Sequence, residues 1–171
     1  MNDRKEIFID KNKICIKGNL HTHSNKSDGI YSIKELLKIY KENSYDFIAI
    51  TDHDIFCDDD IEDEIVLIHG IEASCLYVGK DKTKGAYTHF CCFAPYRKVK
   101  PQIHYYKNCS ELQENIKELK QEYSLIQLNH TLFCRFLDNE FIKLEGYQLI
   151  EIYNHDDFLE ESGMQNSEQL I

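Results

Sequence analysis

The stretch that decides the fold is Gly18-Asn19-Leu20-His21-Thr22-His23-Ser24-Asn25-Lys26-Ser27-Asp28-Gly29. The apolar run Ile14-Cys15-Ile16 leads into this stretch, and we interpret the run as a buried strand. On an extended backbone the spacing i, i+2 puts the imidazoles of His21 and His23 on one face, where they can chelate a transition metal. Asp28 follows on a turn and can bring an oxygen ligand to the same edge. The alternative for this motif alone is a pair of surface histidines in a loop.

The composition fits a single domain over residues 1–171, because a chain of this length can bury its own core. No apolar run is long enough to cross a bilayer, and the N-terminus lacks the apolar segment of a secretory signal. We therefore expect a cytoplasmic protein with no membrane partner. The formal net charge of -10 disfavours broad nucleic-acid binding, which needs a basic surface.

The chain has seven cysteines, an odd number, and no Cys-x-x-Cys motif. This pattern indicates reduced thiols rather than a disulfide framework. Four of the cysteines lie in apolar segments, where a thiol behaves as a small hydrophobic side chain: Cys15, Cys75, Cys91 and Cys92. The alternative for a minority of the cysteines is an incidental metal contact.

Apolar runs alternate with amphipathic segments along the chain. Ser32-Ile33-Lys34-Glu35 is a capping box that opens a helix, and Ser110-Glu111-Leu112-Gln113 is expected to cap a second one. A third helix is expected over residues 136–145. Continuous apolar runs predict strands at 47–50, 65–68, 86–94, 125–128 and 149–153, and an edge strand at 7–9. This order predicts the α/β class, with a mostly parallel sheet or barrel.

Polar residues of the kind that bind metals follow five of the expected strands. The carboxyl ends of parallel strands lie on one face of a barrel, so these residues are expected to converge there and to form a multinuclear metal site: His21 and His23, His53, Glu72, His130, and Asn154 with His155.

The remaining histidines have different expected roles. We interpret His69 as structural, and His104 as a solvated residue in an irregular connection. His89 lies inside an apolar strand, where a hydrogen-bonded core histidine is the usual finding. His155 could reach the site.

Several of these motifs, in this order, resemble those of the PHP (polymerase and histidinol phosphatase) superfamily. The resemblance rests on His-Thr-His-Ser-Asn-Lys-Ser-Asp-Gly, Ile-Thr-Asp-His, Gly-Ile-Glu, Leu-Asn-His and the run from Gly146 to Asn154. It covers about residues 14–155. The resemblance implies a distorted (β/α)7-type barrel that holds up to three metal ions and hydrolyses phosphoesters.

The resemblance also implies which residues hold each ion. His21, His23 and Glu72 would hold the first metal, and Glu72 would bridge to a second metal held by His89 and His130. Asp28 and His53 would hold the third. Imidazoles combined with carboxylates favour Zn, Mn or Fe over Mg. We expect His53 and Glu72 to take part in the reaction itself.

Two features depart from the family pattern. Thr131 follows the histidine of the Leu-Asn-His motif, where proline is usual. The family's final Asp-x-His motif, which adds a ligand to the first and third metals, does not occur after Asn154. We therefore expect a C-terminally incomplete barrel, whose open sheet edge could pair with a second copy of the chain.

The function that these observations favour is a metal-dependent phosphoesterase. A metal-activated water would hydrolyse a small phosphomonoester or a nucleotide-like phosphodiester. The absence of the Asp-x-His motif leaves open a second function, a catalytically impaired metal-binding or interaction domain. A nuclease or proofreading module is a weaker alternative, because the chain is acidic and lacks basic clusters.

Overall fold

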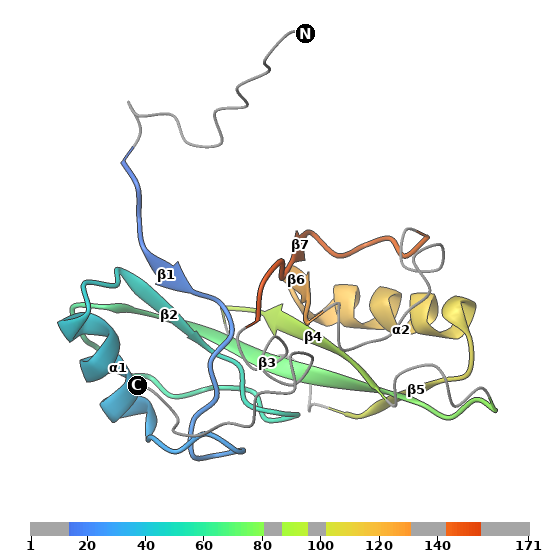
Figure 1. Ribbon diagram of the computed structural model, residues 1–171, viewed down its shortest axis with the longest axis horizontal. Helices are drawn as coiled ribbons and strands as arrows, with labels where there is room; N and C mark the ends of the chain where they lie inside the picture. The colour runs from blue at the N-terminus through green and yellow to red at the C-terminus, as the bar shows by residue number, and fades with distance from the viewer. Residues whose placement is uncertain (1–13, 81–86, 96–101, 131–142, 155–171) are drawn as a thin grey trace, which may run out of the picture.

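The computed structural model describes residues 14–80, 87–95, 102–130 and 143–154. Its elements, in chain order, are β1 (Gly18–Asn19), α1 (Ile33–Glu42), β2 (Phe47–Ile50), β3 (Val66–Tyr77), β4 (Tyr87–Phe93), β5 (His104–Tyr106), α2 (Cys109–Glu122), β6 (Leu125–Leu128) and β7 (Leu149–Ile150). These elements form a mixed α/β fold, as predicted (Figure 1).

The strands form one curled sheet in the order β1-β2-β3-β4-β6-β7, and β5 pairs separately with β3. The sheet is mostly parallel, as predicted, but β4 in its centre runs antiparallel to both β3 and β6. The other pairs are parallel. The described part of the chain thus forms a half-barrel. It contains two helices, so it does not show a full (β/α)7 alternation.

Strand β3 is the spine of the sheet and runs through both halves of the molecule (Figure 1). Residues 66–69 pair with β2, whereas residues 70–76 pair with β4. The sequence predicts a strand over 65–68 that ends before Glu72; the strand is present, but its predicted end is wrong. After Gly70, side chains of β3 alternate between the two faces of the sheet. Ile71, Ala73 and Cys75 pack in the core between the sheet and α2, which we call the outer core, and Glu72 points to the opposite face. Glu72 therefore lies in the middle of a strand.

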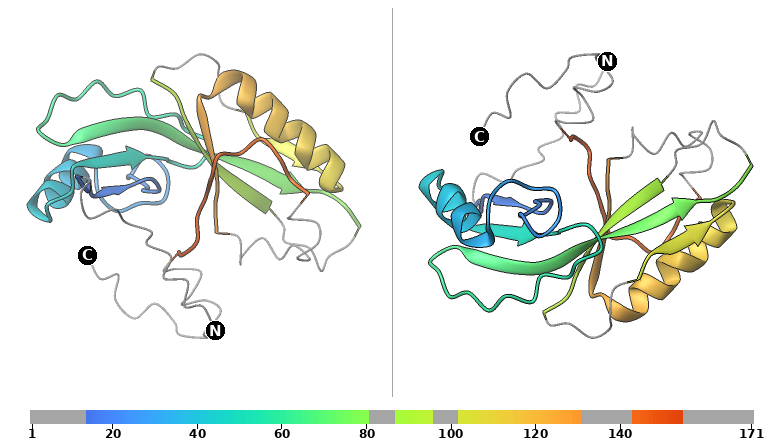
Figure 2. Two further views of the ribbon diagram at one scale, coloured as in Figure 1. Left: turned by 90° about the horizontal axis from the view of Figure 1, so that it is seen from above. Right: turned by 90° about the horizontal axis from the view of Figure 1, so that it is seen from below.

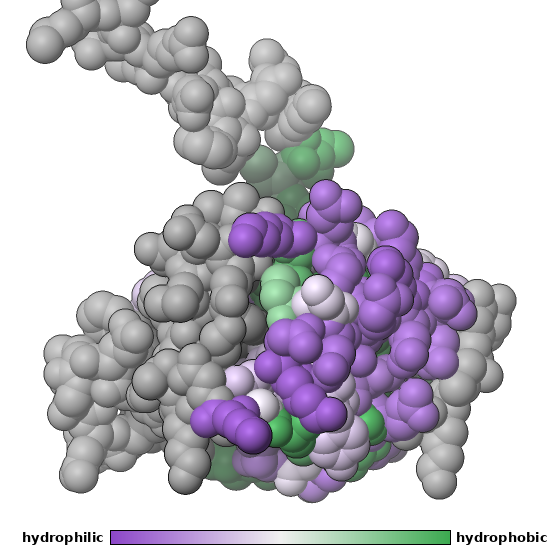
Figure 3. All heavy atoms as spheres, turned by 90° about the vertical axis from the view of Figure 1, so that its right-hand side faces the viewer, coloured by the Kyte–Doolittle hydropathy of each residue, from purple (hydrophilic) through white to green (hydrophobic). Residues whose placement is uncertain are grey.

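The two helices cover the outer face of the curled sheet in two places (Figure 2). Ile33, Leu36 and Leu37 of α1 pack on β2, and an equivalent apolar stripe of α2 packs on β3, β4 and β6. A third, smaller cluster of Ala49, Cys91 and Phe93 lies apart from both helices. The solvent-facing side of α2 is hydrophilic, as its charged residues predict (Figure 3). Neither helix of the described chain is long and apolar enough to span a bilayer.

Both ends of the sheet differ from the prediction. Ile14 and Ile16 are 92% and 69% exposed and belong to no strand, so the predicted buried strand at 14–16 is wrong, and Cys15 is exposed with them. At the other end β7 is shorter than the predicted strand over 149–153, and Ile152 is 91% exposed. Each run lies at an end of the strand order, where a neighbour on only one side leaves apolar side chains uncovered.

The two helix starts were predicted with different success. Ser32 and Glu35 form the predicted capping box at the start of α1. Helix α2 begins at Cys109, and its cap is Asn108, whose side chain accepts a hydrogen bond from the backbone N–H of Glu111 at 3.0 Å. The prediction that Ser110 caps this helix is therefore wrong. The strand expected at 7–9 and most of the helix expected at 136–145 lie outside the described residues.

We expect the substitution Asn108→Ala to lower the free energy of unfolding by about 1 kcal/mol, because it removes the cap of α2. The matched substitution Ser110→Ala should change this free energy by less than about 0.5 kcal/mol, because Ser110 lies inside the helix and is exposed. Urea denaturation followed by circular dichroism measures both values. A larger effect at Ser110 than at Asn108 would contradict the observed helix start.

Candidate metal centre

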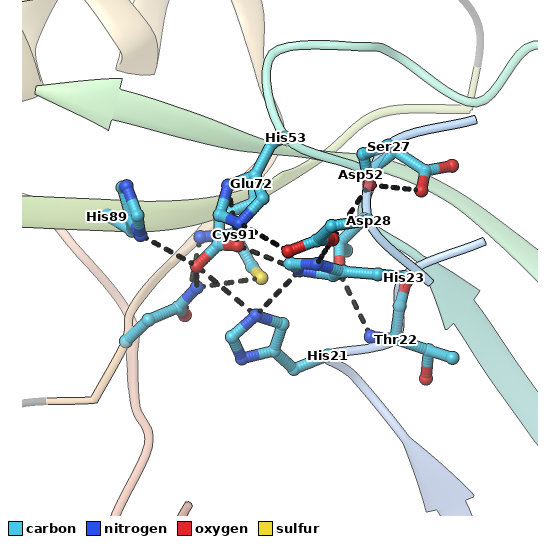
Figure 4. A network of polar contacts seen from close by, with 12 residues as sticks. His21, Thr22, His23, Ser27, Asp28, Asp52, His53, Glu72, His89 and Cys91 are labelled. Atoms are coloured by element: carbon cyan, nitrogen blue, oxygen red, sulfur yellow. Dashed lines mark hydrogen bonds and ion pairs between the residues drawn. The ribbon is translucent and has the colours of Figure 1, made fainter. Parts of the chain in front are cut away.

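The site is built around the buried carboxylate of Glu72, which is 1% exposed. Five imidazoles surround it with nitrogen–oxygen distances of 2.8 to 3.4 Å (Figure 4). They belong to His21, His23, His53, His89 and His130. Asp28 joins the cluster through His23 Nδ1 at 2.6 Å and His53 Nε2 at 3.5 Å. The structure thus brings all seven candidate residues together and excludes the alternative of two surface histidines in a loop.

Five strands bring these side chains to one place. His21 and His23 follow β1, His53 follows β2, and His130 follows β6. Glu72 instead lies inside β3, so the expectation that it follows a strand end is wrong, and His89 lies inside β4, as predicted. The antiparallel pairing of β3 with β4 sets their positions. His130 has a φ of 25°, which is a strained conformation for a residue with a side chain.

The described residues contain three groups of metal-donor atoms in which all the donors lie within 4.8 Å of one another. The groups are His23 with His53 and Glu72, Glu72 with His89 and His130, and His21 with Glu72 and Cys91. Glu72 is common to all three, which agrees with its expected bridging position. The resemblance instead grouped His23 with His21, and these two rings are also close, with 3.2 Å between their Nε2 atoms.

Asp52 holds the loop that carries the N-terminal ligands. Its buried carboxylate accepts hydrogen bonds from the Ser24 N–H at 2.7 Å, the Ser24 hydroxyl at 2.6 Å and the Ser27 hydroxyl at 2.7 Å. Gly29 closes this loop so tightly that a Cβ there would lie 2.2 Å from the carbonyl oxygen of His23. Sequence reasoning missed Asp52, because the partner serines are 25 and 28 residues away.

Asn129 is a second residue that sequence reasoning left without a role. It is fully buried, and its Nδ2 donates to Glu72 Oε1 at 2.7 Å and to Cys91 Sγ at 3.0 Å. Gln127 in turn donates to Asn129 Oδ1 at 3.1 Å. This network of buried hydrogen bonds fixes the orientation of the Glu72 carboxylate.

Glu151 connects the two ends of the sheet. One carboxylate oxygen lies 2.9 Å from His21 Nδ1, just after β1, and the other accepts the backbone N–H of His130 at 2.7 Å. A hydrogen bond from Nδ1–H to Glu151 orients the His21 ring so that Nε2 faces Glu72, where loss of the Nε2 proton would make this nitrogen a metal ligand. Glu151 lies in the run from Gly146 to Asn154 that carries part of the family resemblance. The sequence predicted it only as part of a strand over 149–153, so its role was not recognised.

The side chains of the cluster shift one another's pKa values. Burial alone would raise the pKa of Glu72, but hydrogen bonds from the surrounding imidazoles outweigh burial and hold this pKa far below its usual range. Burial would lower the pKa of His21, yet hydrogen bonds to Glu151 and Glu72 outweigh it and raise this pKa to about 9. For His53, burial dominates and lowers the pKa, and the charges of neighbouring imidazoles act in the same direction.

The residues present fit a divalent transition metal. Glu72 Oε2 is buried and receives no hydrogen bond from the described residues, although the His23 ring lies 2.8 Å away. A buried carboxylate oxygen among imidazole nitrogens is the donor set that such ions prefer.

The other histidines lie apart from the cluster. His69 belongs to none of the donor groups of the described chain. His104 was expected to be solvated, and this expectation is wrong: it is 8% exposed and lies 3.4 Å from Glu118 of α2. The packing of α2 against β5, which no local pattern encodes, buries it. His155 lies outside the described residues.

The curled sheet and the histidine cluster around one carboxylate define a domain with a candidate centre for divalent metal ions. The chain belongs to the PHP domain family, whose sequence model matches residues 19–154. It is also similar to the DNA polymerase/3'-5' exonuclease PolX of Bacillus subtilis (strain 168), with 50% identity over 38 residues. That match covers 22% of this chain and 7% of PolX.

We expect the metal-free protein to lose stability as the pH rises from about 6.5 to about 9. His21 has a pKa of about 9 when folded and 6.5 when unfolded, so its protonation stabilises the fold fully below pH 6.5. That contribution disappears as the pH rises through 9, and His23 acts in the same direction. Urea denaturation at a series of pH values in a chelating buffer measures the effect. A free energy of unfolding that rises over this range would contradict the assignment.

The substitution Glu151→Gln should lower the free energy of unfolding of the metal-free protein by about 1–3 kcal/mol at pH 7. Both partners of Glu151 are donors, and an amide offers only one acceptor, so one of the two hydrogen bonds is lost. The pKa of His21, followed by NMR, should fall as well. Glu114→Gln on the exposed face of α2 is the control, because it removes the same charge and should leave the pKa of His21 unchanged.

Proposed function

We propose that this protein is a metal-dependent phosphoesterase that acts on a small phosphomonoester or a nucleotide-like phosphodiester. The single observation that carries the proposal is the buried Glu72 carboxylate with five imidazoles around it. Bound divalent ions would supply Lewis acidity and a water of lowered pKa, which is the chemistry that phosphoester hydrolysis needs.

The proposed ligands are those implied by the family resemblance. His21, His23 and Glu72 hold one ion, Glu72 with His89 and His130 holds a second, and Asp28 with His53 holds a third. Zinc, manganese and iron are the metals that this donor set favours. His53 has the most exposed imidazole of the five, at 33%, so it is placed to exchange a proton with a substrate or with solvent.

A small substrate fits the charge of the chain better than a polynucleotide. The formal net charge is -10, and a phosphate-bearing ligand would depend on the metal ions for its attraction. The name of PolX includes an exonuclease activity, but the match covers 7% of that protein.

The exposed apolar residues at the two ends of the sheet also support pairing with a second copy of the chain.

The test is phosphate release from p-nitrophenyl phosphate by metal-free protein supplied with Mn²⁺ or Zn²⁺. We expect the double substitution His21→Ala with His23→Ala to lower kcat/KM by at least about 100-fold, because it removes two ligands of one ion. His69→Gln is the matched control and should retain activity, since His69 lies outside the cluster.

Two outcomes would overturn the proposal. The double variant could be as active as the unaltered protein, in which case the cluster does not perform the reaction. Alternatively, the unaltered protein could bind metal and turn over neither aryl phosphates nor dinucleotide phosphodiesters. The second outcome would favour a metal-binding or interaction domain.

A further inference from the structure

Cys91 lies beside Glu72 on the inner face of the sheet. The antiparallel register of β3 and β4 places Glu72 directly opposite Cys91, so the two side chains emerge from neighbouring strands on the same face. Cys91 is fully buried, and Ala49 and Phe93 pack around it. The next residue, Cys92, is equally buried but points to the outer core under α2.

The hydrogen bonds of the two thiols differ in direction. Cys91 Sγ accepts a hydrogen bond from Asn129 Nδ2 at 3.0 Å, and the same amide donates to Glu72 Oε1 at 2.7 Å (Figure 4). Cys92 Sγ instead donates to the carbonyl oxygen of Phe90 at 3.5 Å. A hydrogen bond accepted by sulfur favours the thiolate form, whereas a hydrogen bond donated by the thiol favours the protonated form.

Cys91 Sγ belongs to one of the three groups of metal-donor atoms. This sulfur, an imidazole nitrogen of His21 and a carboxylate oxygen of Glu72 lie within 4.8 Å of one another. His23 Nε2 is 3.2 Å from His21 Nε2, but His23 belongs to a different group of donors, with His53 and Glu72. The Glu72 oxygen nearest His21 is Oε1, which lies 3.2 Å from His21 Nε2. Sulfur, nitrogen and oxygen are donors that four-coordinate zinc accepts, with a water in the remaining position.

We propose that Cys91 is a thiolate ligand of the metal ion held by His21 and Glu72, and that this ligand makes the site selective for zinc or ferrous iron over manganese. The inference rests on the metal site of the proposed function and adds a ligand and a metal class to it. Thiolate sulfur is a soft ligand that favours zinc, whereas a shell of imidazole and carboxylate alone also accepts manganese.

Binding of Cys91 to the metal releases one proton and changes no oxidation state. On coordination the S–H bond of Cys91 breaks, a sulfur–metal bond forms, and one proton passes to the buffer. In the metal-free protein, burial and the negative charge of Glu72 raise the pKa of Cys91, while hydrogen bonds from Asn129 and Thr51 act in the opposite direction. A dication next to Glu72 offsets that negative charge and stabilises the thiolate.

The decisive experiment is a titration of the metal-free, reduced full-length protein with Co²⁺, followed by absorption spectroscopy. We expect a near-ultraviolet charge-transfer band from thiolate to cobalt in the unaltered protein and in Cys92→Ser. In Cys91→Ser the band should be absent while Co²⁺ still binds. Zn²⁺ affinity should fall at least about tenfold in Cys91→Ser, and Mn²⁺ affinity should change little.

X-ray absorption at the zinc edge of the unaltered protein needs no variant and should show sulfur at about 2.3 Å. Bound Co²⁺ without the band, a band that persists in Cys91→Ser, or a zinc shell of nitrogen and oxygen alone would overturn the inference. A band without phosphate release would instead overturn the proposed function and leave the ligand assignment intact.

Discussion

The rest of the structure depends on one constraint, the need to neutralise a carboxylate that is buried inside a sheet. Glu72 is 1% exposed, and an isolated buried charge would cost several kcal/mol. The chain meets this cost with five imidazoles from four separate segments and with the Asn129 amide. The segments next to Glu72 in the sequence do not contain this many imidazole nitrogens. Neutralising Glu72 therefore requires that strands distant in the sequence converge on it.

The mixed sheet is the arrangement that makes this convergence possible. In the first half of β3 the neighbour is the parallel strand β2, whose end delivers His53. In the second half the neighbour is the antiparallel strand β4, which delivers His89 from within the strand. Glu72 lies close to the point where the pairing changes. Strand β3 thus brings Glu72 next to ligands from one parallel and one antiparallel neighbour.

Much of the fold and of the site could be predicted from local sequence. The capping box of α1 and the apolar runs of β2, β4 and β6 are local features, and the structure agrees with them. The convergence of the ligands was also expected from their motifs. The length of β3, the antiparallel direction of β4 and the burial of His104 depend on which strand or helix packs next to each element, and local periodicity carries no such information.

The roles of Asp52, Asn129 and Glu151 escaped sequence reasoning for a related physical reason. Each of these side chains forms hydrogen bonds with residues that are distant in the sequence. From the sequence alone, a single polar residue near a strand end could pair with many other polar residues. Only the three-dimensional register selects one of them. The ligand histidines were easier to identify, because their residue type already narrows the chemistry.

The contact between Glu151 and His21 has a consequence for the kinetics of the site. The two strands that it connects are two residues long each and lie at opposite ends of the sheet order, where strands open more readily than in the centre. When β7 frays, His21 loses the group that holds its ring, although the core under both helices stays folded. An ion held by His21 would then exchange with solvent through this local opening, without global unfolding.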